Sequence, residues 1–189
     1  MTNPTIPTIG YAYGHASGNP SAAQGPTTLQ QTHLPHTAIL QWQNMIICPQ
    51  ASAQKEAALS DVQWACTQLS QAVRTACQKP HPFLVIGGDH SCAIGTWHGA
   101  HAGYAEPIGL IWLDAHLDSH TPESSHSRNI HGMPLATLLG YGYPELIHLS
   151  APAPILNPQD LAIIGFSDYE PEEWTFIQKQ PVHCHPLSS

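Results

Sequence analysis

The chain has 189 residues, of which 42% are hydrophobic and 10% are charged, a composition typical of one globular domain and not of a disordered chain. Its formal net charge of −8 includes only 5 Lys and Arg residues, which argues against the clustered basic surface that nucleic-acid binding requires. There is no long apolar run and no leader-like N-terminus, so we expect no membrane span and a cytoplasmic location.

Predicted strands and helices alternate along the chain. Short runs rich in apolar residues are expected to be strands, at residues 6–12, 37–47, 83–87, 108–113, 161–166 and 182–185. Helices are expected between them, at residues 26–32, 52–79, 91–102, 134–139 and 171–179. The second helix has the clearest pattern, because its apolar residues recur every three or four positions and Pro80 follows its end.

Two of the predicted strands are apolar throughout, FLVIG at residues 83–87 and IGLIWL at residues 108–113. Strands that are buried on both faces and alternate with helices are typical of a parallel sheet covered by helices on both sides. The Pro- and Gly-rich stretches lie at predicted turns and mark no domain boundary. We therefore predict a single α/β domain, residues 1–189, built as a three-layer sandwich around a mostly parallel sheet.

Residue types that bind metals follow both of these strands. Asp89 and His90 follow the first, and Asp114, His116 and Asp118 follow the second. Side chains two residues apart in an extended segment point to the same side, so the last three are predicted to converge. His90 would face the same cavity if the two strands were neighbours, at the sheet edge where parallel sheets bind ligands. Imidazole and carboxylate ligands without a thiolate favour Mn²⁺ or a similar divalent ion.

Three segments carry a resemblance to a known family. They are GGDHS at residues 87–91, DAHLD at residues 114–118 and SRNIHGMP at residues 127–134. These resemble the signature segments of the ureohydrolases, the family of arginase, agmatinase and formimidoylglutamase. The likeness extends from about residue 5 to residue 185 and includes IGFSDYEPEE at residues 164–173. It implies the arginase-like form of the α/β sandwich and a small guanidino or amidino substrate.

The resemblance implies a role for each candidate residue of the metal site. His90 and Asp118 would hold one Mn²⁺, His116 would hold a second, and Asp114 would bridge the two. Such an ion pair makes a hydroxide available at neutral pH for attack on the guanidinium or amidine carbon. His131 would carry a proton to the leaving amine, a task suited to imidazole.

The resemblance also implies a substrate-binding end. Ser127 and Asn129 match positions there, and Glu170 falls where arginases place an acidic residue for the substrate's α-amino group. His120 stands where arginases usually have Asn, and it could still donate a hydrogen bond to a carboxylate. Ser167 replaces an Arg that is common in the family. Arginine, converted to ornithine and urea, is the favoured substrate, with agmatine and formimino compounds as alternatives.

The family supplies two further metal-ligating aspartates from a D-x-D segment on a later strand, and this sequence contains no D-x-D. We therefore expect the C-terminal strands of the sheet to be missing and the second metal position to be poor. Three hypotheses remain open: a Mn²⁺-dependent amidinohydrolase, an inactive truncated or split-chain form, and a one-metal hydrolase or metal-binding protein. The expected polypeptide partners are further copies of the chain, since relatives form trimers or hexamers, or a complementing C-terminal chain.

Overall fold

The computed structural model describes residues 5–32, 39–49, 51, 53–104, 106–150 and 152–187. The strands are β1 (Ile6–Ala12), β2 (Leu40–Ile47), β3 (Leu84–Gly87), β4 (Leu110–Leu113), β5 (Leu161–Ile164) and β6 (His183–His185). The α-helices are α1 (Gln24–Gln31), α2 (Leu59–Cys77), α3 (Cys92–Gly103), α4 (Pro134–Leu138), α5 (Pro144–Ile147) and α6 (Pro171–Ile177). Each predicted strand and helix is found, several with shorter bounds, whereas α5 was not predicted. Residues 37, 38 and 52, at the starts of two predicted elements, lie outside the described residues.

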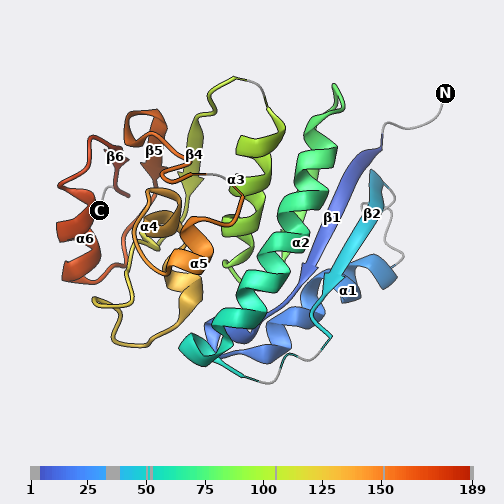
Figure 1. The fold of residues 1–189 in the computed structure, drawn as a ribbon, viewed down its shortest axis with the longest axis horizontal. Coiled ribbons are helices and arrows are strands. Elements are labelled where there is room, and N and C mark those ends of the chain that lie inside the picture. The colour runs from blue at the N-terminus through green and yellow to red at the C-terminus, as the bar shows by residue number, and fades with distance from the viewer. Residues whose placement is uncertain are drawn as a thin grey trace.

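The described strands form two parallel sheets, with the orders β2-β1-β3 and β4-β5-β6. All four strand pairings are parallel, as the alternation of elements predicts. β3 and β4 belong to different sheets, so the strands that lead to the candidate metal ligands are not hydrogen-bonded neighbours. Figure 1 shows the two sheets side by side, with α2 and α3 in front of the region between them.

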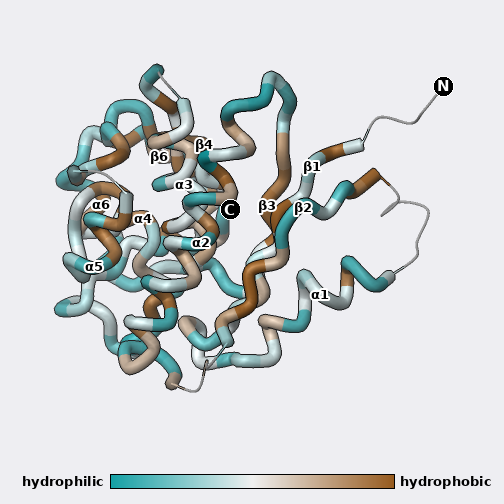
Figure 2. The backbone as a smooth tube through the Cα atoms, turned by 45° about the vertical axis from the view of Figure 1, so that its right-hand side comes forward, coloured by the Kyte–Doolittle hydropathy of each residue, from teal (hydrophilic) through white to brown (hydrophobic). Residues whose placement is uncertain are grey.

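Helices cover the two sheets differently. α1 and α2 lie on opposite sides of β2-β1-β3, which is the predicted three-layer arrangement (Figures 1 and 2). On β4 and β5, one face packs against α3, α4 and α6 and forms an apolar core with them. The other face is open: Ile111 is 67% exposed and Leu113 is 73% exposed. The prediction that residues 108–113 are buried on both faces is therefore wrong, because no described helix covers this second face.

Close contact between α2 and α3 sets the position of the turn that precedes α3. Gly95 and Gly99 face α2, where a Cβ would lie 2.7 Å from the Cys66 carbonyl oxygen and 2.5 Å from that of Ser70. Any larger side chain would push the two helices apart. α3 therefore begins at a fixed place beyond β3, and His90 lies in the turn just before it.

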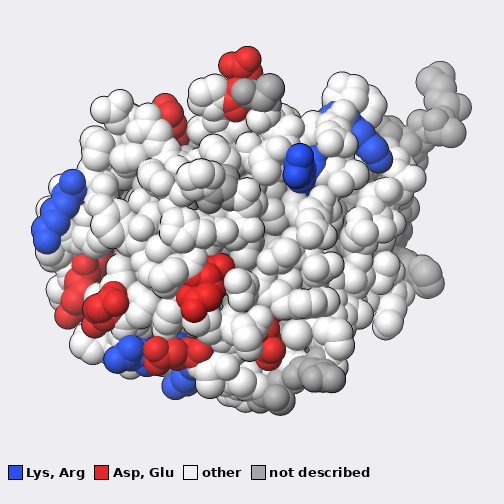
Figure 3. Space-filling model, viewed as in Figure 1, with Lys and Arg blue, Asp and Glu red and all other residues white. Residues whose placement is uncertain are grey.

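The surface of the molecule is poor in basic side chains. Figure 3 shows one face, on which acidic side chains gather toward the end of the molecule that carries α6. No helix in the described part of the chain combines the length and the apolar character needed to cross a membrane.

Candidate metal centre

The segments that follow β3 and β4 meet at three side chains. The imidazole Nδ1 of His90 donates a hydrogen bond to Oδ2 of Asp118 and lies 3.4 Å from Oδ2 of Asp114. One ligand atom from each of these residues lies within 4.8 Å of the others, a spacing that one metal ion can bridge. The two separate sheets thus bring His90, Asp114 and Asp118 together without being paired to one another.

Asp114 lies between two imidazoles. Its Oδ2 faces His90, and its Oδ1 lies 3.3 Å from Nδ1 of His116. His116 is outside the three-residue group, its side chain is 59% exposed, and its Nε2 lies 3.7 Å from Oδ2 of Asp168. The two oxygens of Asp114 therefore point toward different candidate ligands, as a bridging carboxylate requires.

The backbone from Asp114 to Asp118 is a turn and not an extended strand. The backbone N–H of His116 donates to Oδ1 of Asp114 at 2.9 Å, and the φ angle of Asp118 is +46°. This left-handed conformation is unfavourable for most residues but is tolerated by Asp, whose short polar side chain bonds locally. The expectation that an extended segment aligns the three side chains is wrong. The turn brings Asp118 back toward His90 and leaves His116 at the surface.

The ring of Trp112, on the buried face of β4, packs against the ring of His90. The two rings stack with centroids 4.7 Å apart and planes 27° apart. Burial lowers the pKa of His90, but the hydrogen bond to Asp118 and the charges of Asp118 and Asp114 outweigh burial, so that the pKa is raised overall. Carboxylates that favour a cationic imidazole would equally favour a metal cation in the same place.

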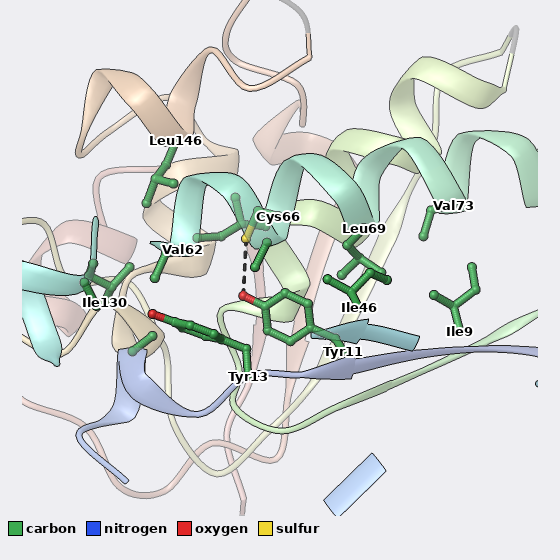
Figure 4. Close-up of a cluster of buried hydrophobic side chains, with 14 of the residues drawn as sticks. Ile9, Tyr11, Tyr13, Ile46, Val62, Cys66, Leu69, Val73, Ile130 and Leu146 are labelled. Atoms are coloured by element: carbon green, nitrogen blue, oxygen red, sulfur yellow. Dashed lines mark hydrogen bonds between the residues drawn. The ribbon is translucent and has the colours of Figure 1, made fainter. Parts of the chain in front are cut away.

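Asp89 does not join the metal group, although its position beside His90 made it a candidate ligand. Its Oδ1 accepts hydrogen bonds from the N–H and the hydroxyl of Ser91, and its Oδ2 accepts one from the N–H of Ser17 at 3.2 Å. Burial raises the pKa of Asp89, and the bonds to Ser91 oppose this shift. Ser91 in turn contacts Tyr11, whose hydroxyl also meets Cys66 in the core shown in Figure 4. Through these hydrogen bonds, Asp89 connects the end of β3 to the buried core.

The donor set fits a divalent cation that prefers oxygen and nitrogen ligands. His90, Asp114 and Asp118 offer one imidazole nitrogen and carboxylate oxygens, a combination suited to Mn²⁺. Cys92 is not part of this group of ligand atoms, and burial raises the pKa of its thiol to about 12. Two carboxylates beside one imidazole leave a negative charge that a cation would neutralise.

The loop after Asp118 folds back over this end of the sheets. The N–H of Leu135 donates to the Asp118 carbonyl at 2.9 Å, and the N–H of His120 donates to the Gly132 carbonyl at 3.2 Å. His131, the residue before Gly132, is half-buried in the short 3-10 helix η5 (Ile130–Gly132). An electrostatic interaction with His131 lowers the pKa of Asp89 against the larger effect of burial, so the imidazole lies near the end of β3.

Of the four residues expected at the substrate-binding end, three belong to the loop after Asp118 and the fourth, Glu170, immediately precedes α6. Nε2 of His120 lies 3.3 Å from Oε2 of Glu170, the residue before α6. The N–H of Asn129 donates to Oγ of Ser127 at 3.3 Å. The Oδ1 atom of Asn129 is buried and has no hydrogen-bond partner among the described residues.

Sequence reasoning missed His126, Glu172 and Glu173. Nε2 of His126 lies 3.4 Å from Oε1 of Glu172 and 3.8 Å from Oε2 of Glu170. The buried Glu173 accepts hydrogen bonds from the N–H groups of Ser119 and Glu170. The E-P-E-E run at residues 170–173 is visible in the sequence, but its contact with a loop some 50 residues earlier depends on the fold.

The chain is similar to known proteins in both sequence and structure. The sequence pattern of the Arginase family matches residues 5–188. An arginase of Bacillus caldovelox is 41% identical over 120 residues, which are 64% of this chain and 40% of that protein. An arginase of Bacillus subtilis is 43% identical over 120 residues, with the same shares. The structure of Bacillus caldovelox arginase matches with a TM-score of 0.86 at 30% identity, covering 97% of this chain and 64% of that one. The chain thus spans less than two thirds of the length of these relatives.

Proposed function

Because the chain belongs to the Arginase family, we propose that it acts as a metal-dependent hydrolase of guanidino or amidino C–N bonds, with arginine as substrate and urea as product. The observation that carries this proposal is Asp114, whose two oxygens face His90 on one side and His116 on the other. Agmatine and formimino compounds are the alternative substrates. We further propose that residues 1–189 act as one ureohydrolase-type domain in the cytoplasm.

Mn²⁺ is the ion that the donor set supports best, with two ions per complete site. His90 and Asp118 would bind one ion, His116 the other, and Asp114 both. When bound, Mn²⁺ supplies a Lewis acid that activates water at neutral pH. The acidic group proposed to bridge the ions is already oriented by its contact with the N–H of His116.

The remaining residues bind the substrate or move protons. His131 is proposed to carry a proton to the leaving amine from its half-buried place in η5. Glu170 is proposed to receive the substrate's amino group, with His120 beside it at 3.3 Å. Ser127 and Asn129 are proposed to complete this end, as their positions in the SRNIHGMP segment imply.

A second candidate function is a metal-binding, split-chain subunit that turns over only with a complementing chain. Two observations favour it. The side chain of His116 is 59% exposed and lies outside the ligand group. The second face of β4 exposes Ile111 and Leu113, which a further layer of structure would cover. Assembly into a homo-oligomer would cover this face as well. The molecular mass of the particle in solution distinguishes a homo-oligomer from a complex with a complementing chain.

The test measures bound Mn²⁺ per chain and urea release from arginine and agmatine in the same samples of the full chain. Two ions per chain and turnover that falls by about 10²- to 10⁴-fold in His131→Ala would support the enzyme, since general acid–base groups contribute on that order. His148→Ala, a change at an exposed histidine elsewhere, is the matched control. One ion or none, with no turnover from either substrate, would contradict an independent enzyme and favour the subunit.

A further inference from the structure

A lysine far away in the sequence lies beside the loop that carries the proposed substrate-binding residues. Lys55 begins the short 3-10 helix η4 (Lys55–Ala58), which leads into α2. A Cβ built on Gly18 would lie 3.6 Å from Cε of Lys55 and 3.5 Å from Oδ1 of Asn129. The stem of the lysine and the amide of Asn129 therefore both border Gly18.

Gly18 also connects this lysine to the candidate metal centre. The N–H of the preceding residue, Ser17, donates to Oδ2 of Asp89 at 3.2 Å, and Asp89 precedes His90 in the chain. The segment around Gly18 follows β1, which pairs in parallel with β3, so both strands end on this side of their sheet. Lys55 thus lies at the same end of the sheet as the candidate centre.

The residues on either side of the lysine are fixed by contacts with other segments. Oε1 of Glu56 accepts a hydrogen bond from the hydroxyl of Tyr143 at 2.9 Å and lies 3.7 Å from Nη1 of Arg128. The carbonyl oxygen of Ala53 lies 3.0 Å from Nδ1 of His15, within hydrogen-bonding distance. The start of η4 is therefore held against the loop that contains Arg128.

The backbone of Lys55 has a left-handed conformation, with a φ angle of +57°. This conformation is unfavourable for a residue with a long side chain and persists only where the surroundings impose it. The contacts of the neighbouring Ala53 and Glu56 supply that constraint. The fold thus keeps the lysine stem beside Gly18 at a cost in backbone energy, a situation that is common at ligand sites.

The positive charge of Lys55 is not balanced by a described residue. The chain has only 5 Lys and Arg residues, and both Lys55 and Arg128 belong to this region. The Nη1 atom of Arg128 donates to the Pro122 carbonyl at 2.9 Å and also faces Glu56. In the part of the chain that the structure describes, the ammonium group of Lys55 forms no ion pair and no hydrogen bond. It is therefore available to an anionic group of a ligand.

We propose that Lys55 binds the carboxylate of the substrate and so makes the chain prefer arginine to agmatine, which is arginine without that carboxylate. The inference rests on the proposed function, in which Glu170 receives the substrate's amino group. The N–H of His120, whose Nε2 faces Glu170, donates to the Gly132 carbonyl in η5, and Asn129 immediately precedes η5. The acidic Glu170 and the basic Lys55 thus lie at two ends of one connected loop, an arrangement that suits the opposite charges of an α-amino acid.

Isothermal titration of the full chain with arginine and agmatine, in the presence of Mn²⁺, tests this role. The unsubstituted chain should bind arginine more tightly than agmatine by about 5-fold or more, since an exposed ion pair contributes up to about that factor. Lys55→Met keeps the apolar stem and removes the charge, so it should lower the affinity for arginine to that for agmatine. The affinity for agmatine itself should not change.

Two further variants separate charge from structure. Lys55→Arg keeps the charge and should retain the preference for arginine. Lys79→Met, at an exposed lysine just beyond the end of α2, should bind both compounds as the unsubstituted chain does. Because the carboxylate and Lys55 are exposed to salt, the preference of the unsubstituted chain should decrease as the ionic strength rises, whereas Lys55→Met should show no such change.

The results distinguish this inference from the proposed function. Binding of both compounds with the same preference in Lys55→Met as in the unsubstituted chain would overturn the role of Lys55 and leave the proposed function standing. Equal affinity of the unsubstituted chain for arginine and agmatine would do the same. Failure of the chain to bind either compound would overturn the role of Lys55 together with the proposed function.

Discussion

The indole ring of Trp112 stacks on the imidazole of His90 with the two centroids 4.7 Å apart. Trp112 belongs to the buried face of β4, whereas His90 follows β3 in the other sheet. The position of a candidate metal ligand therefore depends on a core residue from a strand with which its own strand does not pair.

Trp112→Leu should weaken Mn²⁺ binding, because it removes the surface against which the His90 ring rests. We expect a loss of about 10-fold or more, comparable to the removal of a supporting partner at other metal sites. Trp112→Phe keeps an aromatic face and should retain most of the affinity. Isothermal titration of the metal-free chain with Mn²⁺ measures both variants.

Because Trp112→Leu also shrinks a core residue, its control must separate packing from positioning. Phe166→Leu is such a control, since Phe166 is buried in the same apolar cluster and its ring contacts are with Tyr169 and Trp174. It should lower the free energy of unfolding while leaving Mn²⁺ affinity unchanged. Equal losses of affinity in the two leucine variants would argue against a specific role for the stacking.

Truncation to Ala should affect the free energy of unfolding very differently at two isoleucines on adjacent strands. Ile163 of β5 is fully buried, and Ile163→Ala should lower the free energy of unfolding by about 2–5 kcal/mol. Ile111 of β4 is 67% exposed, and Ile111→Ala should change it by no more than about 0.5 kcal/mol. Urea unfolding monitored by tryptophan fluorescence measures both. A large loss in Ile111→Ala would mean that another layer, such as a second copy, covers this face in solution.

The contrast between Ile163 and Ile111 shows which features of a strand can be predicted from the sequence and which cannot. The apolar runs identify β4 and β5 because strand formation is dictated by nearby residues. Whether both faces of a strand are covered depends on helices far away in the chain, so Ile111 and Leu113 were placed inside when they lie outside.

At the candidate site too, the sequence predicts some features and not others. The motifs named His90, Asp114 and Asp118, and the fold brings these three together. The left-handed turn at Asp118 has no signature in the DAHLD segment, which reads equally well as an extended strand end. His126 was passed over because its partner Glu172 is distant in sequence and only the packing of α6 against the loop joins them.

Stability should fall as the pH is lowered from 7 to 5, in part through His98. Burial, aided by the charges of His101 and His148, lowers the pKa of this histidine from about 6.5 to about 4. Between these values the unfolded chain binds more protons than the folded one, so protonation favours unfolding as the pH falls. At pH 5 this contribution is on the order of 2 kcal/mol, from about 1.4 kcal/mol per unit of pKa difference.

His98→Gln removes the titrating group while it keeps a side chain able to hydrogen-bond to Ser150, whose hydroxyl lies 2.9 Å from Nδ1 of His98. Urea unfolding at pH 7.5 and pH 5 gives the free energy of unfolding for each protein. The difference between the two pH values should be smaller in the variant by roughly 2 kcal/mol. A variant that loses as much stability as the unsubstituted chain would show that other groups control the acid sensitivity.

Asp118 should tolerate Asn far better for folding than for metal binding. The residue has a φ angle of +46°, and Asn is the side chain closest to Asp in its tolerance of this conformation. Asp118→Asn should therefore keep the free energy of unfolding within about 1 kcal/mol, whereas Asp118→Val, which is β-branched, should lose more. The amide has no negative charge, so Mn²⁺ affinity should fall by at least about 10-fold in both variants.

Asp168→Asn provides the matched control, because Asp168 is a carboxylate near His116 but its side chain is 85% exposed and outside the ligand group. It should change Mn²⁺ affinity much less than Asp118→Asn does. Mn²⁺ titration and urea unfolding on the same preparations separate the two effects. If Asp118→Asn bound Mn²⁺ as tightly as the unsubstituted chain, Asp118 would not be a ligand, and its contact with His90 would serve only to hold the turn that follows β4 against the end of β3.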